Sequence, residues 1–235
     1  MSRPVDVIIR ARQVYQNEGL MSLTKRGFTF LRYCLFVYRN YYFYSDPIEH
    51  VGDLNEADFL PKFDSFIGRL VSSNEEAEEL EAAGLLFRAQ VPNANKSLDS
   101  GAVASVIFID NRLAHIGWVA LSEEGQKSIG EPPYSVDFSN HEGCAGGSWT
   151  HPRYRRLGLR RYSRFVLDSF LLENGIRIKR TAVAKNNIPG IKSRGNPDRD
   201  PCGEGRYIRI LWWKSWKERR LPASPSSPSP TSTLR

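Results

Sequence analysis

The residues from Ser148 to Tyr162, SWTHPRYRRLGLRRY, combine features that suit phosphate binding. A short apolar-to-polar run ends at Pro152, an arginine-rich turn with one glycine follows, and an amphipathic helix runs from Gly158 to Asn174. The backbone N–H groups and the dipole at a helix N-terminus attract anions. The stretch therefore predicts a strand, a cationic turn and a helix start that together hold a phosphate group.

A strand–helix–strand unit surrounds this turn. Gly143 to Thr150 reads as a strand in spite of its three glycines, and glycine inside a strand often marks a bulge or the close approach of another group. Apolar side chains then recur at helical spacing and would dock the helix on a sheet. Gly175 suits a left-handed helix end, and Ile176 to Ala184 predicts the next strand. These elements indicate the α/β fold class with a mixed sheet.

Two further strands and an acidic helix precede the unit. Ala102 to Ile109 and Leu113 to Leu121 flank a short turn, which predicts an antiparallel hairpin. His115 lies in its second strand, where a single histidine is more often a packing residue than a catalyst. Ser73 and Glu76 form a capping box for a helix whose glutamates indicate a solvated face, so we expect no metal site.

Composition favours anionic partners. The 235-residue chain carries a net charge of +7, which suits phosphorylated cofactors, anionic lipid or nucleic acid. Its three cysteines are widely spaced, so they indicate neither a disulfide framework nor a zinc site and fit a reducing cytoplasm. The first residues show no signal-peptide pattern, so we do not expect a secretory leader.

Residues 1 to 47 predict a basic aromatic helical arm that ends at Asp46-Pro47. Four basic residues interrupt the apolar stretch from Leu20 to Tyr44, which therefore lacks the ~20 largely uncharged residues of a transmembrane helix. Residues 1 to 44 contain seven Lys and Arg against two Asp and Glu, a net charge of +5. Such a helix either packs on the domain or on a second copy in a homodimer, or makes a peripheral contact at the inner face of the membrane.

The C-terminal end combines aromatic residues with a low-complexity tail. Tyr207 to Trp213 predicts a strand, and we expect Trp212, Trp213 and Trp216 to complete the sheet and core. Base stacking and anchoring at a lipid interface are the alternatives for these tryptophans. Leu221 to Arg235 is rich in Pro and Ser and predicts a disordered tail.

The pattern TxPxxRxxG from Thr150 to Gly158, followed by the amphipathic helix, a glycine, a strand and Asn187, resembles the GNAT N-acyltransferase superfamily. The resemblance covers residues 50 to 217. The N-terminal arm and the closing ILWWKSW segment are similar to those of a GNAT subgroup associated with bacterial envelope and surface-polysaccharide biosynthesis. The resemblance implies a GNAT-like single domain over residues 48 to 220, with acetyl-CoA as co-substrate.

The resemblance also implies a role for each matching residue. Trp149, Thr150 and His151 would line the pantetheine arm of the cofactor, mainly through their backbone, and Asn187 would bond to the same arm. Backbone amides of the turn would hold the pyrophosphate, and the turn residues are Arg155, Arg156, Leu157, Gly158, Leu159 and Arg160. Arg156 and Arg160 stand where many members of the superfamily have glycine, and we expect them to bind the phosphates as well.

Acyl transfer to an amine needs a base for the ammonium proton and an acid for the leaving thiolate. The resemblance implies a base near the central strand, for which Glu142 is the first candidate and His141 the second. The acid is usually a tyrosine in the helix after Asn187, but Ile188 to Gly195 contains none. Cys144 is expected to be a packing residue, because nothing near it in the sequence would lower the pKa of its thiol.

These observations predict an acyl-CoA-dependent N-acyltransferase. The acyl group would be acetyl, and the acceptor a small amine such as an amino sugar. The alternative is a catalytically silent module of the same fold that binds a ligand or partner, as the missing tyrosine suggests. A nucleic-acid binder is disfavoured because no recognised nucleic-acid motif is present.

Overall fold

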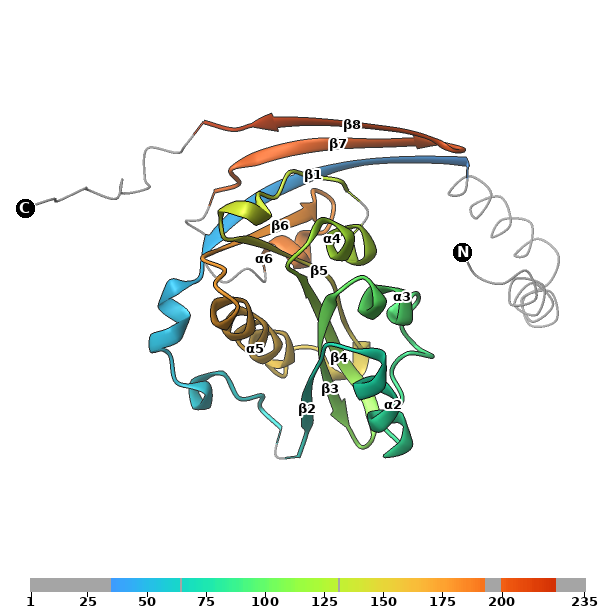
Figure 1. The fold of residues 1–235 in the computed structure, drawn as a ribbon, viewed down its shortest axis with the longest axis vertical. Coiled ribbons are helices and arrows are strands. Elements are labelled where there is room, and N and C mark those ends of the chain that lie inside the picture. Colours follow the sequence, from blue (N-terminus) through green and yellow to red (C-terminus); the bar gives the residue numbers. More distant parts are fainter. Residues whose placement is uncertain (1–34, 64, 131, 193–199, 223–235) are drawn as a thin grey trace, which may run out of the picture. The chain divides into compact units, whose positions relative to one another are not determined.

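The computed structural model describes residues 35–63, 65–130, 132–192 and 200–222. Two compact units make up the chain, one of Met1–Asn40 with Arg206–Lys217 and one of Tyr41–Gly205 with Glu218–Arg235. The strands form an eight-stranded sheet in the order β2-β3-β4-β5-β6-β1-β7-β8 (Figure 1). This mixed α/β fold confirms the predicted fold class.

The strands are β1 (Phe36–Pro47), β2 (Ile67–Val71), β3 (Ala102–Ile109), β4 (Arg112–Ala120), β5 (Glu142–Thr150), β6 (Ile178–Ala184), β7 (Gly203–Ile210) and β8 (Trp213–Arg220). The α-helices of the described residues are α2 (Asn74–Ala82), α3 (Ala94–Asp99), α4 (Glu123–Ile129), α5 (Leu159–Glu173) and α6 (Ile188–Lys192). Short 3-10 turns are η1 (Glu49–Asp53), η2 (Glu56–Phe59), η3 (Phe138–Asn140) and η4 (Pro152–Tyr154). The predicted hairpin is confirmed as β3 and β4, and the predicted acidic helix as α2, whose N-terminus is capped by Ser73.

The prediction of a helical arm is wrong at its C-terminal end, because Phe36–Pro47 is strand β1. From Tyr41 to Pro47 the strand pairs antiparallel with β6. Its aromatic residues fit a strand that is buried on one face and partly exposed on the other, and this packing overrides the approximate helical spacing of the apolar positions. Residues 1–34 of the predicted arm and residues 223–235 of the predicted tail lie outside the described residues.

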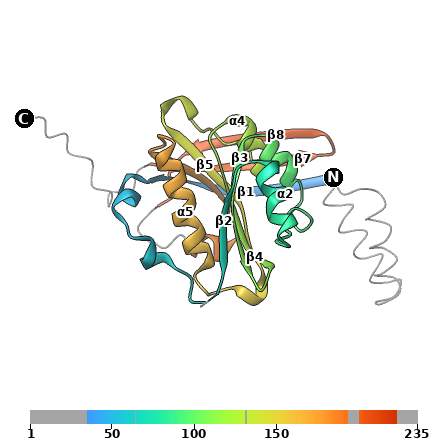
Figure 2. The same ribbon diagram turned by 60° about the horizontal axis from the view of Figure 1, so that its bottom comes forward.

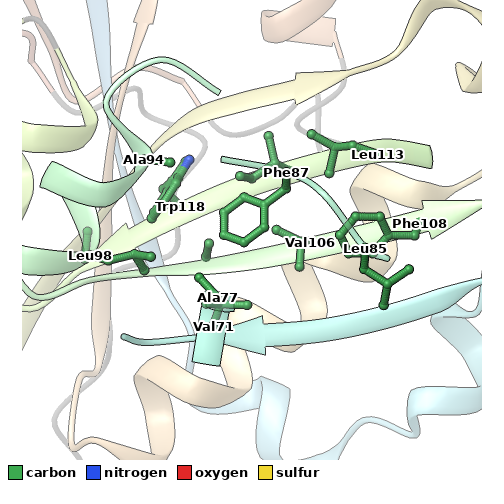
Figure 3. Packing of buried hydrophobic residues seen from close by; sticks show 13 residues of the cluster. Val71, Ala77, Leu85, Phe87, Ala94, Leu98, Val106, Phe108, Leu113 and Trp118 are labelled. Atoms are coloured by element: carbon green, nitrogen blue, oxygen red, sulfur yellow. The ribbon is translucent and has the colours of Figure 1, made fainter. Parts of the chain in front are cut away.

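Helices cover both faces of the sheet in the second unit (Figure 2). On one face, α2 and α3 enclose a core around Phe87, Phe108 and Trp118 (Figure 3). On the other face, Leu167 and Leu171 of α5 pack against β3 and β4. Every residue of β3 is buried, which is the pattern of a central strand between two covering layers.

A buried ionic cluster fixes α5 to the strands beneath it. Lys179 of β6 is buried, and its Nζ donates to Asp168 Oδ2 of α5 at 2.6 Å. Arg164 lies 3.4 Å from Asp168 and 3.5 Å from the buried Asp46 of β1. Burial lowers the pKa of Lys179 to about 8, an effect that the negative charge of Asp168 opposes. Lys179 therefore still carries its charge at neutral pH and depends on Asp168 for compensation.

Replacing Asp168 by Leu should lower the free energy of unfolding by about 3–5 kcal/mol, because a buried ammonium group loses its counter-charge. The double variant Asp168→Leu with Lys179→Met should recover most of this loss, because two apolar side chains of similar size replace the pair. Urea denaturation of both variants measures the difference. Equal losses in the single and the double variant would contradict the role given to the ion pair.

Candidate functional site

The central feature of the candidate site is a pair of parallel strands that separate. β5 and β6 pair in parallel from Glu142–Ile178 to Ala145–Thr181, and this ladder ends there although both strands continue. β6 instead stays with β1, which it pairs as far as Tyr41–Ala184. Among the described residues, the edge of β5 from Gly146 to Thr150 therefore has no strand partner on the side of β6. Such an edge can pair with the amide groups of an extended ligand, as an added strand would.

A bulge in β5 lies directly after this separation. Trp118 of β4 is opposite Gly146 and Ile116 is opposite Trp149, so two residues of β5 face the single Gly117. Gly147 has a φ of +56°, and a Cβ there would lie 2.8 Å from the ring of Trp118. Only glycine fits this position, which confirms that the glycines mark a bulge and a close approach. The bulge redirects the last residues of β5 toward the arginine-rich turn.

The turn that follows contains two residues with positive φ and leads into α5. Pro152–Tyr154 forms η4, after which Arg156 has a φ of +67° and Gly158 a φ of +84°. Gly158 is the N-cap residue of α5 and supplies no side-chain cap, so the first turn of α5 presents its amides to a ligand. Leu157 is held from outside, because its carbonyl accepts the Lys62 amide at 2.9 Å.

The side chains of the turn divide into anchors and cations. Tyr154 and Leu159 are buried in one apolar cluster, so they fix the two ends of the turn. Arg155, Arg156 and Arg160 are exposed. The predicted phosphate-binding residues therefore lie on one short segment that is anchored by apolar packing and carries three cations toward solvent.

Close packing places α5 over the sheet at this point. Gly117 of β4 has no side chain, and a Cβ there would lie 3.1 Å from Ser163 Oγ and 3.2 Å from Leu167 Cδ1 of α5. A larger residue would push the helix away from the strand. The N-terminus of α5 is thus set by a glycine on β4 as well as by the turn itself.

His115 of β4, which the sequence indicates to be a packing residue, supports the end of β5. The side chain is buried, and its Nδ1 lies 2.7 Å from Thr150 Oγ1. Burial, together with the positive charge of Arg160, lowers the pKa of His115 to about 3. The ring is therefore neutral at physiological pH and fixes Thr150 without adding charge beside the cationic turn.

The other residues assigned to the pantetheine arm have local partners. Trp149 is 40% exposed and its ring lies edge-on to that of His151, with 5.8 Å between the ring centroids. His151 Nδ1 accepts the Arg153 amide at 3.2 Å and so begins η4. Asn187 follows β6, and its Oδ1 accepts the Gly190 amide at 3.0 Å, which caps α6. The structure thus gives His151 and Asn187 capping functions in addition to any contact with a ligand.

A cavity of about 260 Å³ lies in the same unit as the parallel strands. Its lining residues are Phe43, Ser135, Arg180, Cys202, Gly203, Glu218, Arg219 and Arg220. Arg180 comes from β6, one residue before the last pair of the parallel ladder. The cavity therefore borders the point at which β5 and β6 separate. No sequence pattern indicates it, because its residues come from five separate segments of the chain.

The two predicted catalytic residues have different relations to this cavity. Glu142 Oε2 lies 3.7 Å from Arg180 Nε and accepts the Asp137 amide at 2.9 Å, so one side chain separates it from the cavity. His141 is exposed, and its Nδ1 lies 3.0 Å from the carbonyl of Gly175. The backbone carbonyl of His141 accepts the amides of Arg177 and Ile178. His141 thus positions the start of β5 and β6, whereas Glu142 contacts a residue that lines the cavity.

Tyr134 is a buried hydroxyl that the sequence did not single out. Its ring stacks on Phe43 of the cavity, and its hydroxyl donates to the carbonyl of Arg180 at 3.4 Å. Burial raises the pKa of Tyr134, so the phenol stays protonated. Burial likewise raises the pKa of Cys144 to about 12, although a hydrogen bond with Tyr134 opposes this. Cys144 is therefore an inert thiol, as the packing interpretation predicts.

The described part of the chain holds no group of His, Cys, Asp and Glu side chains arranged to bind a metal ion. None of its helices combines the length and the apolar character that a membrane span needs.

Lowering the pH should destabilise the protein through His115. Its pKa is about 3 in the folded protein and 6.5 in the unfolded chain, so the unfolded chain takes up a proton first as the pH falls below 6.5. The stability is fully present above that value and is lost as the pH falls toward 3, by about 2 kcal/mol at pH 5. Denaturation at neutral pH and at pH 5 should show a smaller loss of stability for His115→Gln than for the wild type. His50→Gln, at an exposed position, serves as the control. An unchanged loss in His115→Gln would contradict this assignment.

Comparison with known proteins gives remote structural similarities. No protein-family model and no curated protein matches the sequence. A functionally unknown conserved protein from Staphylococcus epidermidis is 11% identical with a TM-score of 0.42, over 77% of this chain and 64% of that one. A tandem GNAT protein from the clavulanic acid biosynthesis pathway is 16% identical with a TM-score of 0.43, over 85% and 59%. A GCN5-related N-acetyltransferase-like protein from Streptococcus suis is 15% identical with a TM-score of 0.42, over 87% and 69%. The chain thus spans less than two thirds of the first two proteins, and residue roles rest on its own geometry.

Proposed function

We propose that this chain is an acyl-CoA-dependent N-acyltransferase of the GNAT type, with acetyl as the acyl group. The observation that carries the proposal is the separation of β5 from β6 after Ala145–Thr181, next to a cationic turn at the N-terminus of α5. The edge of β5, which has no strand partner there in the described part of the chain, could pair with an extended amide-containing arm. The turn offers amides and cations for a pyrophosphate. Acyl-CoA contains the same two parts in the same order, since a pantetheine arm with amide groups leads to a pyrophosphate.

The phosphate end of the cofactor would lie at the turn. The amides at the start of α5 would face the pyrophosphate, and the exposed Arg156 and Arg160 would add charge-assisted hydrogen bonds. Arg156 adopts a left-handed φ of +67°, which is relaxed for glycine and less favourable for arginine. A contact between Arg156 and a phosphate would offset this conformational cost.

The pantetheine arm would extend from the turn along β5. Thr150 and Trp149 come first, and the bulge at Gly147 follows at the separated strands. His115 holds the side chain of Thr150 and leaves its backbone in the line of the strand edge. The thioester would then lie where the parallel ladder ends, beside Arg180 and the cavity.

Acyl transfer at that point begins when the ammonium group of the acceptor loses a proton to a base. The amine nitrogen then attacks the thioester carbonyl, the carbon–sulfur bond breaks, and the sulfur leaves as a thiolate, which takes up a proton as the nitrogen loses its second one. We assign the removal of the ammonium proton to Glu142, directly or through a water molecule, because its carboxylate contacts Arg180 of the cavity. We assign the protonation of the thiolate to water, because burial raises the pKa of Tyr134 and makes its hydroxyl a weaker acid than an ordinary phenol.

The cavity favours a small polar amine as acceptor, such as an amino sugar. Its volume of about 260 Å³ is small, and its lining combines the Glu218 carboxylate with three arginines. Glu218 is held in place because Ser135 donates to it from both the amide and the hydroxyl. A carboxylate in this position would attract an ammonium group, while the arginines would bind anionic or hydroxyl groups of the same molecule.

Replacing both Arg156 and Arg160 by Ala should weaken acetyl-CoA binding by about tenfold and reduce its salt dependence, because two phosphate-binding cations are lost. Titration calorimetry measures the affinity, and saturating acetyl-CoA should raise the melting temperature of the wild type by several °C. Arg69→Ala with Arg177→Ala removes the same charge from exposed positions elsewhere and is the matched control. A wild-type protein that acetyl-CoA does not stabilise would refute the proposed function.

Replacing Glu142 by Gln should lower kcat by about 100-fold or more and leave acetyl-CoA affinity unchanged, because the amide keeps the size of the side chain but not its basicity. Glu124→Gln on the exposed face of α4 should leave kcat unchanged and serves as the control. Thiol release with a panel of amino sugars and polyamines measures the rates. Acetyl-CoA binding without thiol release for any amine would favour the silent module instead.

A further inference from the structure

The β7–β8 hairpin of the first unit exposes an apolar tip. β7 ends at Ile210, β8 begins at Trp213, and Leu211-Trp212 forms the turn between them. Trp212 is 84% exposed and Trp213 is 53% exposed. The prediction that these tryptophans complete the core is therefore wrong for both. Trp216, which is partly buried, lies against Tyr207 with 6.5 Å between the ring centroids and so supports the hairpin from within.

The first residues of β1 extend this apolar surface. The Leu211 amide donates to the carbonyl of Leu35 at 2.7 Å, which joins the hairpin turn to the start of β1 (Figure 1). Leu35, Phe36 and Tyr38 are exposed, as are Ile210 and Leu211. We call these five residues, with Trp212 and Trp213, the apolar tip. An exposed cluster of seven large apolar side chains on a small unit marks an interaction surface.

The two residues of this turn are not those that favour a tight chain reversal. Leu211 has a φ of +55°, a conformation in which the Cβ of a leucine crowds the following carbonyl. Two-residue hairpin turns favour asparagine and glycine because these residues adopt this conformation readily. A Leu-Trp pair at this position gives up backbone stability and presents apolar side chains at the outermost point of the hairpin.

The charge of the same unit indicates an anionic partner. Its described residues contain no Asp or Glu, and its cations are Arg39, Arg206, Arg209, Lys214 and Lys217. Lys214 and Lys217 are exposed and follow the apolar tip along β8. Tryptophan at the level of lipid headgroups, with lysine and arginine beside it, is the composition of a membrane-interface anchor.

We propose that the apolar tip inserts into the interface of an anionic lipid bilayer, with Lys214 and Lys217 against the headgroups. This goes beyond the acyltransferase activity and does not depend on it. A second copy of the chain is a weaker partner, because the edge strand β8 carries Lys214, Lys217, Arg219 and Arg220 against the single acidic Glu218, and this net positive charge would repel an identical strand. Nucleic acid is also a weaker partner, because bases could stack on the aromatic rings of the tip but would leave the aliphatic side chains of Leu35, Ile210 and Leu211 uncovered.

Flotation of the full chain with vesicles tests the proposal. Binding to phosphatidylcholine vesicles that contain phosphatidylglycerol should exceed binding to pure phosphatidylcholine and should weaken with salt. Trp212→Ala with Trp213→Ala should lower binding by about tenfold or more. Lys214→Glu with Lys217→Glu should also lower it by about tenfold or more, since each cation near an anionic surface contributes roughly a factor of five.

Matched control variants distinguish an effect of the apolar tip on vesicle binding from an effect of any change in surface polarity or charge. Leu60→Ala with Leu86→Ala removes two exposed apolar side chains of the second unit, and Lys96→Glu with Arg112→Glu makes the same change in charge there. Neither control should alter vesicle binding. All of these positions are exposed, and the far-ultraviolet circular dichroism of each variant should match that of the wild type.

Quenching by brominated lipid identifies the inserted segment. Tryptophan fluorescence should be quenched in brominated anionic vesicles, and Trp212→Phe with Trp213→Phe should abolish most of the quenching while binding persists. Quenching that survives in this variant would overturn the proposal, because other tryptophans would then be the inserted ones. Unchanged vesicle binding in the alanine variant would overturn it as well. So would a dimer that the alanine variant dissociates, or binding of a single-stranded oligonucleotide in place of vesicles.

Discussion

The candidate site depends on how the two edges of β6 pair with their neighbouring strands. This strand pairs with β5 on one side and β1 on the other, and after Thr181 it remains with β1 alone. The bulge at Gly147 then turns β5 away, and the buried Lys179–Asp168 pair holds α5 over the part of β6 that is still shared. The three features of the candidate site lie around this separation of β5 from β6. They are the edge of β5, the N-terminus of α5 and the cavity, and each is positioned by a segment that packs on β5 or β6.

The sequence predicted the elements with strong local signals. The sequence predicts β5, α5 and β6 because glycines, arginines and a helical periodicity follow one another in an order that few folds accommodate. It predicts the β3–β4 hairpin because the residues of its turn favour positive φ. β1 was mistaken for part of a helix, because an aromatic strand with approximate helical spacing is distinguished only by its pairing with a strand more than 130 positions away. The β7–β8 turn was missed because Leu-Trp gives no turn signal.

The residues of the candidate site divide in the same way into those that are neighbours in the sequence and those that are far apart in it. The turn residues from Arg155 to Arg160 are contiguous, so their grouping needed no structure. The cavity brings together residues from Phe43 to Arg220, and the contact between Glu142 and Arg180 depends on the parallel register of β5 and β6. His115 and Tyr134 gained a role only when their burial and partners were known, because a histidine or a tyrosine in a strand-like sequence is ordinarily a packing residue.

The burial of Cys144 makes this residue an internal reporter of strand opening. Its thiol lies on β5 beside the last pairs of the parallel ladder, and burial raises its pKa to about 12. Alkylating reagents attack thiolates, so the folded chain protects Cys144 both by exclusion and by protonation. Its rate of alkylation would therefore follow the frequency with which β5 leaves the sheet, and a ligand seated along the separated strands would slow that rate without touching the sulfur.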